Sequence, residues 1–399
     1  MPISDKITYG YKDLGILTSE ISYVKSRSEC NPYYPSDGNC TPYLPIFASP
    51  MTSVVSSKNF TTFHVNGIDT VIPRDMYNPL DDRMTLMKQG LWVAVSLDEL
   101  NSLFCNEKKT WLEPHETYKI CVDVANGTMA NLYDTCKRAK RVSLKQNYNL
   151  IIMTGNINNP ATYGWVRRLN NGFREKYKVD DFVIDYIRLN IGSGDGCITA
   201  PRTGIYCGKA SLIDECNKIK QEYNGYCCPK IVADGGIKDF GDVCKALALG
   251  ADYVMIGSVF ARMIESAGEK TLNVFSPDFD LPSQSIDDYT DFDYDVENDV
   301  WNAVYSGDGK RYFFGEIDVK FFGMASGDGQ RSMTGKKTKN SEGVTKMLKV
   351  NFSLPKWVNI MTGCLKSAMS YCNSYTLEDF IGKQTLVVLS QNEINSLNK

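Results

Sequence analysis

The chain has 399 residues, 43% of them hydrophobic, and its 44 Lys and Arg nearly balance its 47 Asp and Glu, giving a net charge of −3. This balance produces no overall basic field, so we expect no nucleic-acid partner. The beginning of the chain shows no basic stretch followed by an apolar one, and no apolar run reaches the roughly 18 residues of a membrane span, so we expect neither a signal peptide nor a membrane partner.

Eight short apolar runs recur along the chain, with helical stretches between them. In chain order they are Pro45–Met51, Ile68–Arg74, Leu91–Leu97, Tyr118–Ala125, Tyr148–Asn156, Phe182–Ser193, Lys230–Gly236 and Tyr253–Ser258. Continuous apolar runs are typical of parallel strands that are buried on both faces. Eight strand–helix units predict a closed (β/α)₈ TIM barrel, formed by residues 1–399 as a single catalytic domain. The alternative is an open, doubly wound sheet.

Two regions after the eighth run depart from this alternation of strands and helices. Residues 276–300 contain nine acidic residues and no Lys or Arg, and they lie within an acidic insertion that we place at about 271–315. Its composition favours an exposed loop, either disordered or partner-binding. Residues 326–342 are Gly-rich, polar and basic. They predict a mobile flap near the barrel mouth, with an ordinary surface loop as the alternative.

The chain contains thirteen cysteines and two histidines. The cysteines are scattered and form no C-x-x-C pair, which predicts neither a zinc site nor a disulfide framework. The pattern favours reduced thiols in a cytoplasmic protein. Because the histidines are only His64 and His115, acid–base chemistry must fall to other residue types.

A glycine-rich segment directly follows the sixth apolar run and reads Gly192-Ser-Gly194-Asp195-Gly-Cys197-Ile-Thr199. Glycines let a backbone approach a ligand closely, and their carbonyls and amides can cradle an ion. A cysteine exposed on such a loop is able to act as a thiolate nucleophile. A buried structural cysteine is the competing interpretation.

Two further glycine motifs end the seventh and eighth runs. The first is Asp234-Gly235-Gly236, and the second is Gly257-Ser258. In TIM barrels the loops after these two strands often bind a phosphate through backbone amides. The carboxylate of Asp234 is an acceptor suited to a ribose diol.

Taken in order, these motifs resemble the IMP dehydrogenase / GMP reductase family over roughly residues 10–390. The matching landmarks are Ser49-Pro-Met51, Asp123-Val-Ala-Asn126-Gly127, Thr154-Gly-Asn156, the Cys197 loop, Asp234-Gly-Gly236, Gly241-Asp242, Gly257-Ser258, Phe322-Gly323-Met324-Ala-Ser326 and Glu342-Gly343. The resemblance implies a TIM barrel that is usually assembled as a homotetramer. It also implies a purine nucleotide substrate and a nucleophilic role for Cys197.

Several features resemble the reductase branch of that family. Lys25-Ser-Arg-Ser-Glu29 and the Asp123–Gly127 motif match it, whereas the dehydrogenase branch shows a histidine in the second motif. No regulatory nucleotide-binding insertion interrupts the barrel. The dehydrogenase flap carries an Arg-Tyr pair that activates water, and this flap has Arg331-Ser332 instead. The favoured activity is therefore reductive deamination of GMP to IMP. The alternatives are NAD-dependent oxidation of IMP and a catalytically lapsed purine-binding or assembly protein.

The resemblance also implies a mechanism with residues in named roles. The Cys197 thiolate attacks purine C2, the amine leaves as ammonia, and a nicotinamide cofactor delivers a hydride to the adduct. Thr199 and Glu342 match residues that transfer a proton to the amine; a loop hydroxyl and a helix-start carboxylate are their simpler interpretations. The donor we expect is NADPH rather than NADH, because Lys336, Lys337 and Lys339 of the flap suit a 2′-phosphate. A solvated basic loop is the alternative.

The remaining site residues are also carried over from the resemblance. Cofactor contacts fall on Asp123, Asn126 and Gly127. Potassium would be held by backbone carbonyls of Gly192, Gly194 and Cys197. Substrate contacts fall on Ser49, Met51, Asp195, Asp234, Gly235, Gly236, Gly257, Ser258, Phe321, Gly323 and Met324.

Two of these residues depart from the family pattern. A serine usually stands at the position of Asp195 and a tyrosine at that of Phe321, and both help to bind the substrate phosphate. A carboxylate about 4 Å from a phosphate would repel each unit of its charge by roughly 4 kcal/mol at an effective dielectric of 20. Three outcomes follow: Asp195 turns away, it pairs with a cation or basic residue that then meets the phosphate, or the ligand lacks the usual monophosphate.

Overall fold

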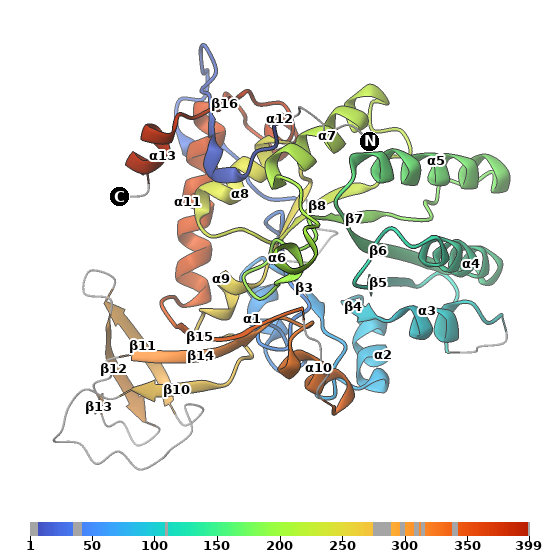
Figure 1. Ribbon diagram of the computed structural model, residues 1–399, viewed down its shortest axis with the longest axis horizontal. Coiled ribbons are helices and arrows are strands. Elements are labelled where there is room, and N and C mark those ends of the chain that lie inside the picture. Colours follow the sequence, from blue (N-terminus) through green and yellow to red (C-terminus); the bar gives the residue numbers. More distant parts are fainter. Residues whose placement is uncertain are drawn as a thin grey trace.

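Eight parallel strands close into a barrel at the centre of the structure, a computed structural model (Figure 1). The barrel strands are β2 (Ile46–Ala48), β3 (Asp69–Ile72), β4 (Trp92–Val95), β5 (Thr117–Asp123), β6 (Asn149–Ile157), β7 (Tyr186–Leu189), β8 (Lys230–Asp234) and β9 (Tyr253–Ile256). Each strand pairs with the next, and β9 closes the ring on β2. Each lies within one of the eight apolar runs or extends it by one residue. The TIM barrel is thereby confirmed, and the open sheet is excluded.

The structure describes residues 7–34, 42–107, 111–273, 289–295, 300–306, 311–312, 316–336 and 342–397. Helices alternate with the barrel strands and surround the barrel (Figure 1). They are α1 (Phe60–Val65), α2 (Leu80–Lys88), α3 (Leu97–Phe104), α4 (Ala130–Gln146), α5 (Pro160–Tyr177), α6 (Thr199–Thr203), α7 (Lys209–Glu222), α8 (Phe240–Ala248), α9 (Ser258–Ala261) and α11 (Leu354–Tyr371). No helix of the described residues combines the length and apolar composition needed to cross a bilayer.

The two terminal regions of the described chain form smaller elements outside the barrel. They are the 3₁₀ turns η1 (Tyr11–Asp13) and η2 (Arg27–Glu29), strands β1 (Leu14–Ile16) and β16 (Leu386–Val388), and helices α12 (Leu377–Phe380) and α13 (Gln391–Leu397). Strands β1 and β16 pair antiparallel, which joins two segments more than 360 residues apart in sequence. The short helix α12 begins with a capping box, in which Thr376 and Asp379 each accept a backbone amide of the other.

The core has two layers, one on each face of the barrel sheet, and this is why the strand sequences are continuously apolar. One cluster fills the barrel interior, and its members are Phe47, Val71, Trp92, Ala94, Cys121, Met153, Val232 and Met255. The larger cluster lies between the barrel and its helices. All four residues of β4 are buried, because alternate side chains enter the two layers. Burying each large apolar side chain contributes roughly 1.5–3 kcal/mol.

The acidic insertion is β-structured where it is described, which corrects the expectation of a loop. Strands β11 (Tyr289–Asp295), β12 (Val300–Ser306) and β13 (Arg311–Tyr312) form an antiparallel sheet that lies to one side of the barrel (Figure 1). A second antiparallel sheet, of β10 (Lys270–Asn273), β14 (Glu316–Phe322) and β15 (Thr345–Lys349), connects this sheet to the barrel. Most of the acidic stretch itself lies outside the described residues.

The described part of the predicted flap is a helix, α10 (Gly327–Thr334), and not a loop. Ser326 begins it by accepting the Gly329 amide at 3.0 Å, and Gly335 ends it in the left-handed conformation. The helix is anchored to the loop after β3, where the Met76 amide donates to the Ser332 carbonyl at 2.8 Å. Lys337 and Lys339 lie outside the described residues, whereas Lys336 lies just beyond the helix.

Candidate active site

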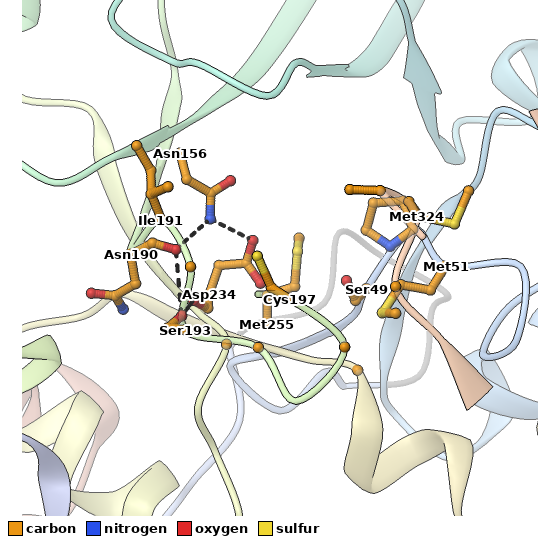
Figure 2. Close-up of a pocket in the computed structure, with 18 of the residues that line it drawn as sticks. Ser49, Met51, Asn156, Asn190, Ile191, Ser193, Cys197, Asp234, Met255 and Met324 are labelled. Atoms are coloured by element: carbon orange, nitrogen blue, oxygen red, sulfur yellow. Dashed lines mark hydrogen bonds between the residues drawn. The ribbon is translucent and has the colours of Figure 1, made fainter. Parts of the chain in front are cut away.

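A cavity of about 300 Å³ opens at the carboxyl ends of the barrel strands. Cys197 lies between Asp234 on one side and Met51 on the other (Figure 2). Fifteen residues predicted for substrate, cofactor or catalysis line it: Ser49, Met51, Asp123, Asp195, Cys197, Thr199, Asp234, Gly235, Gly236, Gly257, Ser258, Phe321, Gly323, Met324 and Glu342. The structure therefore brings together residues from seven separate segments of the sequence.

The Cys197 loop is held in place by the segment that carries Glu342. The Ile198 amide donates to the Glu342 carbonyl at 2.8 Å, and the Val344 amide donates to the Gly196 carbonyl at 3.0 Å. Gly196 and Gly323 pack backbone to backbone, because a Cβ on Gly323 would stand 2.3 Å from the Gly196 oxygen. Loop and segment are thus paired like two short antiparallel strands.

This pairing brings three functional groups into one hydrogen-bonded chain. The Cys197 thiol donates to Thr199 Oγ1 at 3.3 Å, and Thr199 Oγ1 donates to Glu342 Oε2 at 2.7 Å. A thiol, a hydroxyl and a carboxylate in this order provide a path along which a proton can move. Thr199 is separated from Glu342 by 143 residues in sequence.

Cys197 differs from the other thiols in its surroundings. It is half-buried and faces the cavity. Cys121 and Cys244, by contrast, are buried, and burial raises the pKa of the Cys121 thiol to about 11 and that of Cys244 to about 12. Such thiols stay protonated at neutral pH and have no access to a ligand. The cavity position singles out Cys197 as the candidate nucleophile.

A network of two arginines and two aspartates lines part of the cavity. Arg188, on β7, donates to Asp234 Oδ2 at 2.9 Å and lies 3.3 Å from Asp123 Oδ1. Arg74 lies 3.5 Å from the second oxygen of Asp123. Burial by itself would lower the pKa of Arg188, but the Asp234 and Asp123 carboxylates raise it well above its ordinary value. The guanidinium therefore stays charged and fixes both carboxylates.

The carboxylate of Asp234 retains one oxygen for a ligand. Asn156 donates to Asp234 Oδ2 at 2.9 Å, the same oxygen that Arg188 contacts, and this bond is drawn in Figure 2. Within the described residues Oδ1 makes no hydrogen bond. Asp234 thus presents an acceptor that suits the ribose diol predicted for it.

The sequence analysis missed Arg188, Arg74 and Asn156 as site residues. A signal for Arg188 was present, because it interrupts an apolar strand that was expected to be buried on both faces. A charged residue at such a position requires a partner of opposite charge.

Replacing Arg188 by methionine should lower the free energy of unfolding by about 3 kcal/mol, because the largely buried Asp234 loses its counter-charge and Asp123 keeps only Arg74, 3.5 Å away. Denaturant unfolding followed by circular dichroism measures this. The control is Lys145→Met, which removes an exposed ion pair with Glu107 (2.6 Å) and should cost less than about 1 kcal/mol. Equal costs for the two variants would contradict the network's structural role.

A phosphate was predicted at the part of the cavity lined by Gly235, Gly236, Gly257 and Ser258. The hydroxyl of Ser258 donates to Asp195 Oδ2 at 3.0 Å, and Asp195 Oδ1 lies 3.9 Å from Lys238 Nζ. Asp195 therefore neither turns away from the site nor stands without a counter-charge. Phe321 lines the same region with 1% of its surface exposed and offers no hydroxyl.

Two of the predicted cofactor residues do not line the cavity. The side chain of Asn126 accepts the Thr128 amide at 2.9 Å and so caps its own turn. Gly127 packs on the neighbouring strand, where a Cβ would stand 2.5 Å from the Asn156 carbonyl oxygen. The reason is local: both residues shape the turn before α4 and leave only Asp123 of this motif at the cavity wall.

The backbone carbonyls predicted to bind potassium lie on the Cys197 loop. Gly192, Gly194 and Cys197 all line the cavity. The Gly194 carbonyl accepts the Cys197 amide at 2.9 Å, which leaves it one further lone pair.

Comparisons with known proteins point to one family. Residues 94–275 match the model described as the IMP dehydrogenase / GMP reductase domain. The relatives named GMP reductase include that of Shewanella halifaxensis (strain HAW-EB4), 23% identical over 100% of both chains, and that of Vibrio atlanticus (strain LGP32), 24% identical over 100% of both chains. The GMP reductase of Staphylococcus epidermidis (strain ATCC 35984) is 29% identical over 65% of this chain and 73% of its own.

Proposed function

Because the chain belongs to the IMP dehydrogenase / GMP reductase family, we propose that it is an oxidoreductase that converts guanosine monophosphate to inosine monophosphate and ammonia, with NADPH as reductant. The observation that carries this proposal is the hydrogen-bonded chain of Cys197, Thr199 and Glu342 at the cavity. Support also comes from the relatives named GMP reductase, two of which align with the whole chain.

Cys197 supplies the nucleophile. Its sulfur forms a bond to purine C2, and the C2–N bond breaks with its electron pair leaving on the amino group. The thiol loses one proton and the departing amino group gains one, so the exchange yields ammonia without a proton from solvent. When the C–S bond later breaks, its electrons return to sulfur and regenerate the thiolate.

Thr199 and Glu342 move that proton. The thiol proton passes through the Thr199 hydroxyl to the Glu342 carboxylate, along bonds of 3.3 and 2.7 Å, and Glu342 then returns it through the Thr199 hydroxyl to the departing amine. Each group donates to the next in the arrangement observed, so no side chain has to reorient before the first transfer.

The nicotinamide cofactor, NADPH or alternatively NADH, supplies the hydride that takes the place of the amine at C2. Its nicotinamide end would lie near Asp123 and near Gln330 and Met333 of α10, which line the same cavity as Cys197. Asp123 is fixed there by Arg74 and Arg188. Lys336 would meet a 2′-phosphate, and the carbonyls of the Cys197 loop would hold potassium.

We expect a homotetramer in the cytoplasm. The cysteines of the described residues are all free thiols, which suits a reducing compartment. Light scattering on the purified protein measures the assembly.

Steady-state assays in both directions test the reaction. The expected result is faster reduction of guanosine monophosphate by NADPH than oxidation of inosine monophosphate by NAD⁺, because the flap carries Arg331-Ser332 in place of the Arg-Tyr pair that activates water in the dehydrogenase branch. Faster oxidation would reassign the chain to a dehydrogenase activity. Binding of guanosine monophosphate with no turnover in either direction would indicate a lapsed enzyme.

A further inference from the structure

Two lysines lie next to residues that line the cavity, Lys209 beside Gly236 and Lys238 beside Asp195, and the sequence analysis predicted neither of them as a site residue. Lys209 is the first residue of α7, which packs beside β8 (Figure 1). Its Nζ stands 1.8 Å from the position that a Cβ on Gly236 would occupy. Gly236 has φ +74° and lines the cavity, so the absence of a side chain there is what admits the ammonium.

The Lys209 ammonium lacks a counter-charge in close contact. Among the described residues it has no hydrogen-bond or ion-pair partner, although it is half-buried. Burial, and after it the charge of Lys238, lowers its pKa, while Asp242 and Asp195 oppose this from a greater distance. A partly desolvated cation without a partner is unfavourable, and an anionic ligand in the cavity would relieve it.

The neighbouring carboxylates are already engaged. Asp195 accepts from Ser258 at 3.0 Å and faces Lys238 at 3.9 Å. Asp242 accepts the Lys238 amide at 3.0 Å through its Oδ2. The ionised side chains of Asp195, Asp242, Lys209 and Lys238 together carry no net charge, so Asp195 does not by itself make this end of the cavity negative.

We propose that Lys209 is a specificity-determining residue that binds the phosphate of the nucleotide, with Lys238 held beside it by Asp195. This deepens the proposed function and rests on it. Phe321 contributes no hydroxyl here, so the phosphate is recognised by charge. A phosphate monoester carries close to two negative charges at neutral pH, which two ammonium groups match.

Calorimetric titration of wild type and Lys209→Gln with guanosine monophosphate and with guanosine tests the inference. We expect the variant to bind the monophosphate at least about tenfold more weakly and to bind the nucleoside unchanged, because only the former carries the charge. Lys209→Arg should recover affinity for the monophosphate, since a guanidinium also binds phosphate. The weakening should diminish as salt is raised.

The matched control is Lys218→Gln on the same helix, where the ammonium is exposed and already paired with Asp214 at 2.6 Å. It should leave both affinities unchanged. The inference is overturned if Lys209→Gln binds the monophosphate as wild type does, or if wild type binds nucleoside and monophosphate equally well. Either result leaves the proposed reaction to be decided separately, by turnover of whichever compound binds.

Discussion

Replacing Cys197 by alanine is expected to reduce turnover of guanosine monophosphate by about 10³-fold or more while the protein keeps its stability. Cys197 carries the only thiol that lines the cavity within the described residues, and a thiolate is a far stronger nucleophile than the hydroxyl and carboxylate groups there. The substitution removes only the sulfur atom of a half-buried side chain that faces the cavity, so packing of the core changes little. Initial rates and thermal unfolding of the same preparation measure the two halves of this expectation.

Cys364→Ala is the matched control, because Cys364 is a half-buried thiol on α11 that does not line the cavity. Its turnover should equal that of wild type. Alkylation gives an independent readout: guanosine monophosphate should protect Cys197 and leave the labelling of Cys364 unchanged. Turnover of Cys197→Ala close to wild type would remove the thiol from the mechanism.

The barrel was predictable because its strands satisfy a simple physical requirement. A strand covered on both faces must be apolar along its length, and Leu91–Leu97 shows this pattern around the observed Trp92–Val95. The end of that strand was also visible in the sequence. Ser96 caps α3 and exchanges hydrogen bonds with Glu99, so the chain leaves the sheet at the first polar residue.

The strands of the insertion and the helix in the flap could not be predicted from composition, because tertiary contacts determine the local structure there. The stretch around α10 is rich in glycine, which disfavours a helix. Gly329 is nevertheless required there, since a Cβ would stand 2.5 Å from the Gly323 carbonyl oxygen. The contact of the helix with the loop after β3 outweighs the low propensity of its residues.

The site itself was only partly predictable. The motif residues could be assigned to the mouth of the barrel, since they follow successive strands. The positions of the counter-charges could not be predicted. Lys209 reaches Gly236 from a different strand–helix unit, and only the folded geometry shows that Lys238 faces Asp195. A sequence shows which charges a chain has, but not which of them lie in contact.

Replacing Glu342 by glutamine is expected to lower kcat by about 10³-fold with little change in the KM for guanosine monophosphate. The amide can still accept the Thr199 hydroxyl, now held at 2.7 Å by the carboxylate, so the geometry survives. It cannot take up and return a proton, so the amine would leave as an unprotonated anion. Steady-state kinetics at saturating cofactor separate the two parameters.

A second variant distinguishes proton transfer from simple support of the loop. Thr199→Val interrupts the same path between Cys197 and Glu342. If the two residues act in series, the double variant should be no slower than the slower single one, because a path already broken loses nothing more. Multiplicative losses, or a fall in thermal stability that accounts for the lost rate, would contradict the relay. Glu378→Gln, an exposed carboxylate on α12, should leave kcat unchanged and serves as the control.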